Sequence, residues 1–95
     1  MQIESIRHKA LRHFAETGST KGLPAGSVDR LRNILAYIDT IATAEELRVS
    51  PNYSAHQLKG DRKGEWSLTV TKNWRMTFRV NEAGAIEDMD LEDYH

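Results

Sequence analysis

The fold is decided by residues 65–80, which read EWSLTVTKNWRMTFRV. In both halves of this stretch apolar residues alternate with polar ones, and a period of two is typical of a half-buried β-strand. The apolar positions are Trp66, Leu68, Val70, Trp74, Met76, Phe78 and Val80. The stretch therefore predicts a β-hairpin with one apolar face and one polar, basic face.

The register of this hairpin follows from keeping both apolar rows on one side of the sheet. Val70 then faces Trp74. By the same rule Leu68 faces Met76, which leaves a three-residue loop that ends at Asn73. Such a loop usually contains one residue in the left-handed conformation, and we expect that residue to be Asn73.

Helical periodicity dominates the first half of the chain, after a short strand expected near residues 2–6. The first predicted helix covers residues 8–17, where Leu11 and Phe14 lie on a narrow apolar stripe. Gly18 supplies the usual helix stop.

The second predicted helix has the strongest helical pattern in the sequence. Its apolar residues recur at helical spacing and are Val28, Leu31, Ile34, Leu35, Ile38 and Ile41. We expect Ser27 to be its N-cap, with Asp29 in the first turn. Thr43 and Glu46 then have the spacing of a capping box ahead of a short turn through Leu47.

A third strand is predicted at residues 85–91, after a turn at residues 81–84, and its Met89 and Leu91 can reach the core. A chain of 95 residues fits one domain spanning residues 1–95. The predicted fold class is α+β, a curled antiparallel sheet with two N-terminal helices packed on one face. A domain this small buries little more than ~60% of its unfolded surface, so any active site is expected to be an open cleft.

Composition excludes several classes of protein. With 39% hydrophobic residues and two prolines, the chain is no disordered polymer. The absence of cysteine excludes disulfides, thiolate metal sites and a cysteine nucleophile. No stretch has the apolar length of a signal peptide or a membrane span, so we expect a cytoplasmic protein without a membrane partner.

Charge is distributed unevenly along the chain. Residues 1–80 contain all 13 Lys and Arg residues against 8 acidic ones, whereas residues 81–95 contain six acidic residues and no Lys or Arg. This asymmetry suggests a body that faces a polyanion, closed by an acidic strand. A solvated surface whose charges happen to segregate explains it equally well.

Residues 56–64 read HQLKGDRKG, which predicts the start of a strand followed by a glycine-bounded turn. The turn contains three cations, Lys59, Arg62 and Lys63. Clustered cations favour contact with phosphate. A basic turn is, however, more often merely solvated.

Arg75 and Arg79 alternate with core residues and therefore point away from the core. An exposed sheet face kept soluble by charge explains Arg79 as well as a function does. Arg75 lies nearer the hairpin turn and is the better functional candidate.

The sequence ends in Asp93-Tyr94-His95. Terminal residues usually fray. A strand held in place by Met89 and Leu91 would nevertheless deliver these three residues to a defined place at the edge of the sheet.

The histidines suggest a kind of chemistry. Metal-free cleavage of RNA needs one group to take the 2′-hydroxyl proton, one to protonate the leaving 5′-oxygen, and positive charge near the phosphate. Histidine suits both proton transfers because its reference pKa lies near ~6.5. His8 and His13 lie on different faces of one helix and are interpreted as surface residues.

Several motifs together resemble the HigB branch of the RelE-type toxins of bacterial type II toxin–antitoxin modules. The matching stretches are FAETGST at 14–20, HQLKG at 56–60, GEWSLTVT at 64–71, NWRMTF at 73–78 and DYH at 93–95. The resemblance covers essentially the whole chain and implies a RelE-like, microbial-ribonuclease-like fold.

The resemblance also implies an activity and partners. It implies a metal-independent endoribonuclease without a cofactor, which cuts translated mRNA in the decoding site of the 70S ribosome by 2′-hydroxyl attack. It further implies neutralisation by a HigA-like helix-turn-helix antitoxin, through which the complex contacts operator DNA.

Site residues carried over from the resemblance form two groups. The catalytic positions are His56, Asp93, Tyr94 and His95, and the positions near the mRNA phosphates are Lys59 and Arg75. Arg62, Lys63 and Arg79 are added as candidate phosphate-binding residues from the basic turn and the strand alternation. His95 is assigned proton transfer, with Asp93 orienting it or its neighbours. His56 is the complementary acid or base, and Tyr94 stacks on a base or positions the 2′-hydroxyl.

One of these assignments conflicts with the alternation of the predicted strand. Alternation places His56 on the same side as Leu58, which is expected in the core. A twist or bulge at the start of this strand is therefore expected to turn His56 toward the cleft.

Two other functions stay open at this stage. A catalytically weak toxin-like module could act mainly with its antitoxin on operator DNA, although the intact catalytic positions favour an enzyme. An unrelated RNA-binding protein would carry stacking aromatics on its basic face, whereas the two tryptophans alternate with core residues.

Overall fold

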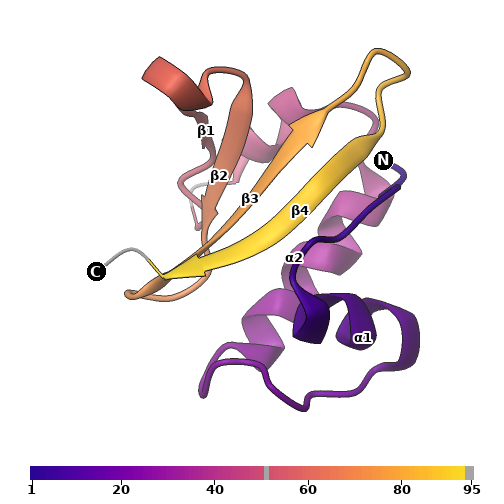
Figure 1. Cartoon of the computed structure of the whole chain (residues 1–95). Helices are drawn as coiled ribbons and strands as arrows, with labels where there is room; N and C mark the ends of the chain where they lie inside the picture. Colours follow the sequence, from indigo (N-terminus) through magenta and orange to yellow (C-terminus); the bar gives the residue numbers. More distant parts are fainter. Residues whose placement is uncertain (51, 94–95) are drawn as a thin grey trace.

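The protein is built around a four-stranded antiparallel sheet (Figure 1). The structure, a computed structural model, describes residues 1–50 and 52–93. The strands follow one another in chain order across the sheet: β1 (His56–Gln57), β2 (Glu65–Thr69), β3 (Trp74–Val80) and β4 (Ile86–Asp93). Two helices precede them, α1 (Lys9–Thr17) and α2 (Val28–Thr40), with short 3-10 helices η1 (Ala44–Val49) and η2 (Gly60–Arg62) between the larger elements. The predicted α+β class is confirmed.

The β2–β3 hairpin has the predicted register, since Leu68 pairs with Met76. The prediction for Asn73 is wrong, because Ser54 and Asp88 are the only described non-glycine residues with a positive φ. The Trp74 carbonyl accepts hydrogen bonds from both the Val70 and the Thr71 N–H, at 3.0 and 3.1 Å. With Trp74 N–H also donating to the Thr71 carbonyl at 3.3 Å, the loop closes as a four-residue turn, which needs no left-handed residue.

Strand β4 contains an irregularity that the sequence did not predict. Its register against β3 shifts between Thr77 and Arg79, and Asp88 has a φ of 55°. One extra residue on β4 at this point is a β-bulge, which bends a strand and strengthens its twist.

The N-terminal segment runs parallel to β4 but is not a continuous strand. It forms two isolated bridges, Ile3 to Ile86 and Ile6 to Met89. Between them the N–H of Asp88 donates to the Ser5 hydroxyl, at 2.8 Å, instead of to a backbone carbonyl. The strand expected near residues 2–6 is therefore reduced to two isolated bridges at the bulged edge of the sheet.

The three sequence signals predicted at helix ends all lie where predicted, although one of them makes no capping bond. Gly18 ends α1 in the left-handed conformation with a φ of 79°, as predicted. Ser27 is the N-cap residue of α2, as predicted, but its side chain makes no capping bond. It is fully buried and donates to the Pro24 carbonyl at 2.7 Å. The predicted capping box of Thr43 and Glu46 is present at the start of η1.

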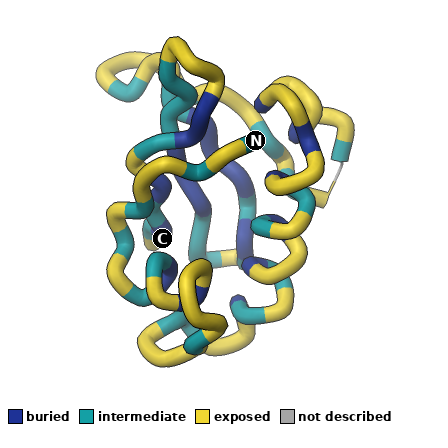
Figure 2. The backbone as a smooth tube through the Cα atoms, turned by 90° about the vertical axis from the view of Figure 1, so that its right-hand side faces the viewer, coloured by how far each residue is buried: buried dark blue, intermediate teal, exposed yellow. Residues whose placement is uncertain are grey.

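The hydrophobic core lies between the helices and one face of the sheet, and Figure 2 shows the buried residues on the inner strands and on one side of the helices. Its fully buried members are Leu11, Leu31, Ile34, Ile38, Leu47, Leu68, Met76, Phe78, Ile86 and Met89. The predicted burial of Met89 and Leu91 is confirmed. The opposite face of the sheet, which we call the outer face, is left to polar side chains.

Candidate active site

The pairing of the strands determines which polar side chains share the outer face. Residues directly opposite each other in an antiparallel sheet point to the same side. His56 pairs with Ser67, which pairs with Thr77 on the next strand. The neighbouring row contains Arg75 paired with Glu92.

His56 lies on the outer face, at the β1 edge of the sheet. The expected twist or bulge is not needed, because the assignment of Leu58 to the core is wrong. Strand β1 ends at Gln57, and Leu58 is only half-buried and outside the core cluster. His56 itself is exposed.

A hydrogen bond orients the His56 ring. Its Nδ1 lies 2.9 Å from the Ser54 carbonyl oxygen. A carbonyl only accepts, so Nδ1 carries the proton and Nε2 is left to take up or release a proton. The ring thus presents a single reactive nitrogen.

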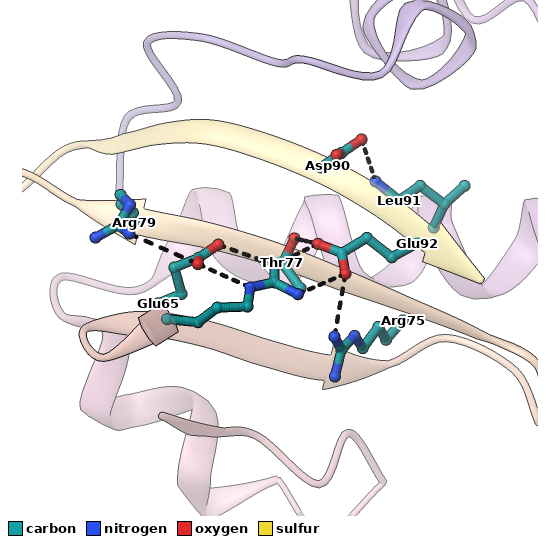
Figure 3. A network of polar contacts seen from close by, with 8 residues as sticks. Glu65, Arg75, Thr77, Arg79, Asp90, Leu91 and Glu92 are labelled. Carbon is teal, nitrogen blue, oxygen red and sulfur yellow. Dashed lines mark hydrogen bonds and ion pairs between the residues drawn. The ribbon is translucent and has the colours of Figure 1, made fainter. Parts of the chain in front are cut away.

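Glu92 is the centre of a polar network on the outer face (Figure 3). Arg62 donates from Nη1 to Glu92 Oε1 at 2.8 Å, Thr77 donates from its hydroxyl to Oε2 at 2.7 Å, and Arg75 donates from Nη2 to Oε1 at 3.1 Å. These donors stabilise the charged carboxylate, so they lower the pKa of Glu92 to about 2, with the Arg62 hydrogen bonds as the largest cause.

Glu65 extends the network along β2. It accepts two hydrogen bonds from Arg62, at 2.9 and 3.0 Å, and lies 3.6 Å from Arg79 Nη2. The Arg62 hydrogen bonds lower the pKa of Glu65, and the two carboxylates raise the pKa of Arg62. Arg62 is thus held by two carboxylates at once.

The structure divides the predicted phosphate-binding residues into two sets. Arg62, Arg75 and Arg79 lie together on the outer face, where Glu65 and Glu92 neutralise most of their charge. Lys59 and Lys63 lie instead on the β1–β2 connection, are exposed, and form no ion pair with another described residue. With His56, they line a hollow of about 630 Å³.

Asp93, the last described residue, lies far from His56. It is exposed and pairs with Trp74 at the β4 edge, on the side of the sheet that alternation gives to the core. Three strand spacings separate the two edges, roughly 14 Å along the sheet. The structure therefore does not bring His56 and Asp93 together, and the predicted Tyr94 and His95 lie outside the described residues.

Sequence reasoning missed Glu92 and Glu65 as partners of the arginines. Arg62 and Glu65 are three residues apart, a spacing that could have suggested the pair, but Glu92 meets Arg62 across 30 positions of the chain. Among the described residues no group of three or more His, Asp or Glu side chains is arranged to hold a metal ion. Likewise, no helix in this part of the chain is long and apolar enough to cross a membrane.

Several solved structures of toxins share this fold. A YoeB/ParE toxin from Agrobacterium tumefaciens superimposes with a TM-score of 0.59 at 17% identity, covering 100% of both chains. YoeB in the YoeB–YefM complex from Staphylococcus aureus gives 0.59 at 15% identity, covering 100% of this chain and 99% of the other. YafQ from E. coli gives 0.55 at 14% identity over 93% and 91%.

Sequence comparison identifies the branch. Residues 4–95 match the family described as the RelE-like toxin of the type II toxin–antitoxin system HigB. The chain is also 45% identical to endoribonuclease HigB of Proteus vulgaris over 93 residues, which is 98% of this chain and 99% of the relative. The protein therefore belongs to the HigB-like toxin family.

Proposed function

We propose that this protein is a toxin endoribonuclease that cuts mRNA on the translating ribosome, in the cytoplasm, and that a helix-turn-helix antitoxin neutralises it. Family membership and the 45% identical endoribonuclease support the ribonuclease activity. The observation that carries the proposal is the exposed His56, whose Nε2 is available beside two unpaired lysines.

The proposed reaction needs no metal. The 2′-hydroxyl of one nucleotide loses its proton to a base and attacks the adjacent phosphorus, and the bond to the 5′-oxygen breaks as that oxygen gains a proton. The products are a 2′,3′-cyclic phosphate and a free 5′-hydroxyl. His56 supplies one of the two proton transfers, and His95 is proposed for the other. Asp93 lies about three strand spacings from His56, so it is proposed to orient His95, and Tyr94 to stack on a base or position the 2′-hydroxyl.

Phosphate charge in this reaction is met by Lys59 and Lys63 near His56 and by Arg75 on the outer face. Arg62 and Arg79 contribute mainly through the network that holds Arg75. The described catalytic groups are few and exposed to solvent. A partner that fixes the geometry of the RNA would therefore supply much of the rate enhancement. This is the reason for proposing ribosome dependence.

The test compares mRNA on translating ribosomes with the same mRNA free in solution, both in the presence of a chelator. Cleavage is expected on ribosomes, with cyclic phosphate ends, and little is expected on free mRNA. Equal rates and positions on free mRNA would contradict ribosome dependence, and loss of activity with the chelator would contradict the metal-free reaction. A protein that binds its antitoxin and operator DNA but cuts nothing would be the interaction module instead.

Deletion of His95 tests the terminal assignment, because it removes a single residue at the chain end. The shortened protein is expected to fold, bind its antitoxin and lose growth inhibition. A chain ending at Tyr94 that still cuts mRNA at the wild-type rate would remove His95 from the proposed mechanism.

A further inference from the structure

Arg48 lies beside the candidate active site, although no motif in the sequence points to it. Its guanidinium lies over the Trp66 ring, 4.8 Å from the ring centroid, and its Nε is 2.9 Å from Glu45 Oε2. The side chain keeps 44% of its surface exposed. The Trp66 ring and Glu45 thus orient the guanidinium on one side, and its other side is open to solvent.

Arg48 forms one wall of the 630 Å³ hollow that His56 also lines. The other lining residues come from β1 and from the segment that links it to β2, namely 56–60, 63 and 64. Among the described residues, none that lines the hollow is acidic, and three carry a positive charge. A concave surface with a single sign of charge attracts a polyanion.

The hollow also has an apolar element and a suitable size. Leu58 lines it and is half-buried without belonging to the core, so part of its surface is left without an apolar partner inside the protein. Pockets of ~300–1,000 Å³ hold ligands of the size of a nucleotide. Positive charge around an apolar surface suits a phosphate with its attached base.

We propose that this hollow binds a nucleotide of the substrate RNA strand, outside the bond that is cut, with Arg48, Lys59 and Lys63 on its phosphate and Leu58 under its base. The inference rests on the proposed ribonuclease function, because His56 on the rim of the hollow is the group that would face the cut bond. An RNA strand that passes His56 can enter the hollow without meeting an acidic side chain among the described lining residues.

The test measures binding of a short labelled 2′-O-methyl RNA, which cannot be cleaved, by fluorescence anisotropy at several salt concentrations. Arg48→Ala is expected to weaken binding roughly tenfold at low salt. It is also expected to reduce the slope of log affinity against log salt by about 0.7, the effect of one lost phosphate contact in a single strand.

Glu45→Gln separates a ligand role of Arg48 from a structural one. Both variants break the Arg48–Glu45 ion pair. If Arg48 binds RNA, removing the neighbouring negative charge tightens binding roughly twofold to threefold, opposite to the effect of Arg48→Ala. If Arg48 only stabilises η1, both variants weaken binding and lower the melting temperature together, which would overturn the proposal.

Arg32→Ala is the matched control, because Arg32 has the same surroundings elsewhere on the surface. It pairs with Asp29 at 2.8 Å and lies 5.8 Å from the Phe14 ring centroid. This variant is expected to bind RNA like the wild type. Equal binding by Arg48→Ala and Arg32→Ala would overturn the proposal, and so would a wild type that does not bind the RNA at low salt.

The last part of the test measures binding of the same variants to ribosomes without mRNA. If Arg48→Ala loses affinity for them but not for the oligonucleotide, the hollow contacts ribosomal RNA, and the proposal for the substrate strand is overturned. A wild type that binds the oligonucleotide through Arg48 yet cuts no mRNA contradicts the proposed function and leaves standing only that the hollow binds RNA. A wild type that cuts while Arg48→Ala cuts equally well contradicts only this inference.

Discussion

Two basic regions of this protein use their cations in different ways. On the outer face, Arg62, Arg75 and Arg79 are held by Glu65 and Glu92. The β1–β2 connection contains Lys59 and Lys63 with no such partner among the described residues. Cations that are held by carboxylates stabilise the fold and have less charge left for a phosphate, whereas unpaired cations at the rim of a hollow are fully available for a ligand.

The largest effect is expected at His56, which lies beside the unpaired lysines of the β1–β2 connection. His56→Ala removes a proton-transfer group, so cleavage on ribosomes is expected to fall by ~10²- to 10⁴-fold. Because His56 is exposed and, within residues 1–50 and 52–93, its ring bonds only the Ser54 carbonyl, the melting temperature should stay within about a degree of wild type. Wild-type cleavage by this variant would remove His56 from the reaction.

Glu92→Ala changes the region in which the arginines are paired. It leaves Arg62, Arg75 and Thr77 without their shared acceptor. We expect the free energy of unfolding to fall by about 2 kcal/mol, less than for a fully buried pair, because water reaches part of the site. Urea unfolding measures the loss, with Asp61→Ala on the exposed turn as the control that should change little.

Acid should weaken the network in a defined range of pH. The folded pKa of Glu92 is about 2, below the ordinary value of 4.5, so its contribution is complete above pH 4.5 and is lost as the pH falls toward 2. The expected loss across this range is about 2 kcal/mol after allowance for screening by solvent. Glu92→Gln should flatten this part of the curve of unfolding free energy against pH, and an unchanged curve would contradict the lowered pKa.

The smallest effect is expected at Lys59, an unpaired cation of the β1–β2 connection. Lys59→Ala removes one unpaired cation near His56, so cleavage should fall by about tenfold. Stability should change by less than about 0.5 kcal/mol, since no described residue pairs with this side chain. A stability loss as large as that of Glu92→Ala would show that the two regions do not differ in the way proposed.

The hairpin shows how far local sequence reaches. Alternation alone placed Leu68 opposite Met76 and put Arg75 on the face away from the core, and both positions are confirmed. The prediction failed at Asn73, where a shared acceptor at Trp74 closes the turn in another way. Alternation constrains the side on which a residue lies, but it says little about the hydrogen bonds that close a loop.

The candidate site was predicted less completely. Motifs named His56, Lys59 and Arg75, but the reasoning missed the carboxylates that hold the arginines and put Leu58 in the core. Strand β1 ends after two residues, so Leu58 lies beyond the strand, although its N–H still donates to the Glu65 carbonyl at 2.8 Å. No local pattern reveals where so short a strand stops.

By itself, the sequence determined the fold class, the hairpin register and the family, because these depend on periodicity and on motifs that are read along the chain. Only the tertiary structure decided which cations are paired. Glu92 reaches Arg62 across 30 positions because the sheet aligns β4 with β3. The bulge at Asp88 sets that alignment, and an interaction between residues so distant in the chain depends on the whole register of the sheet.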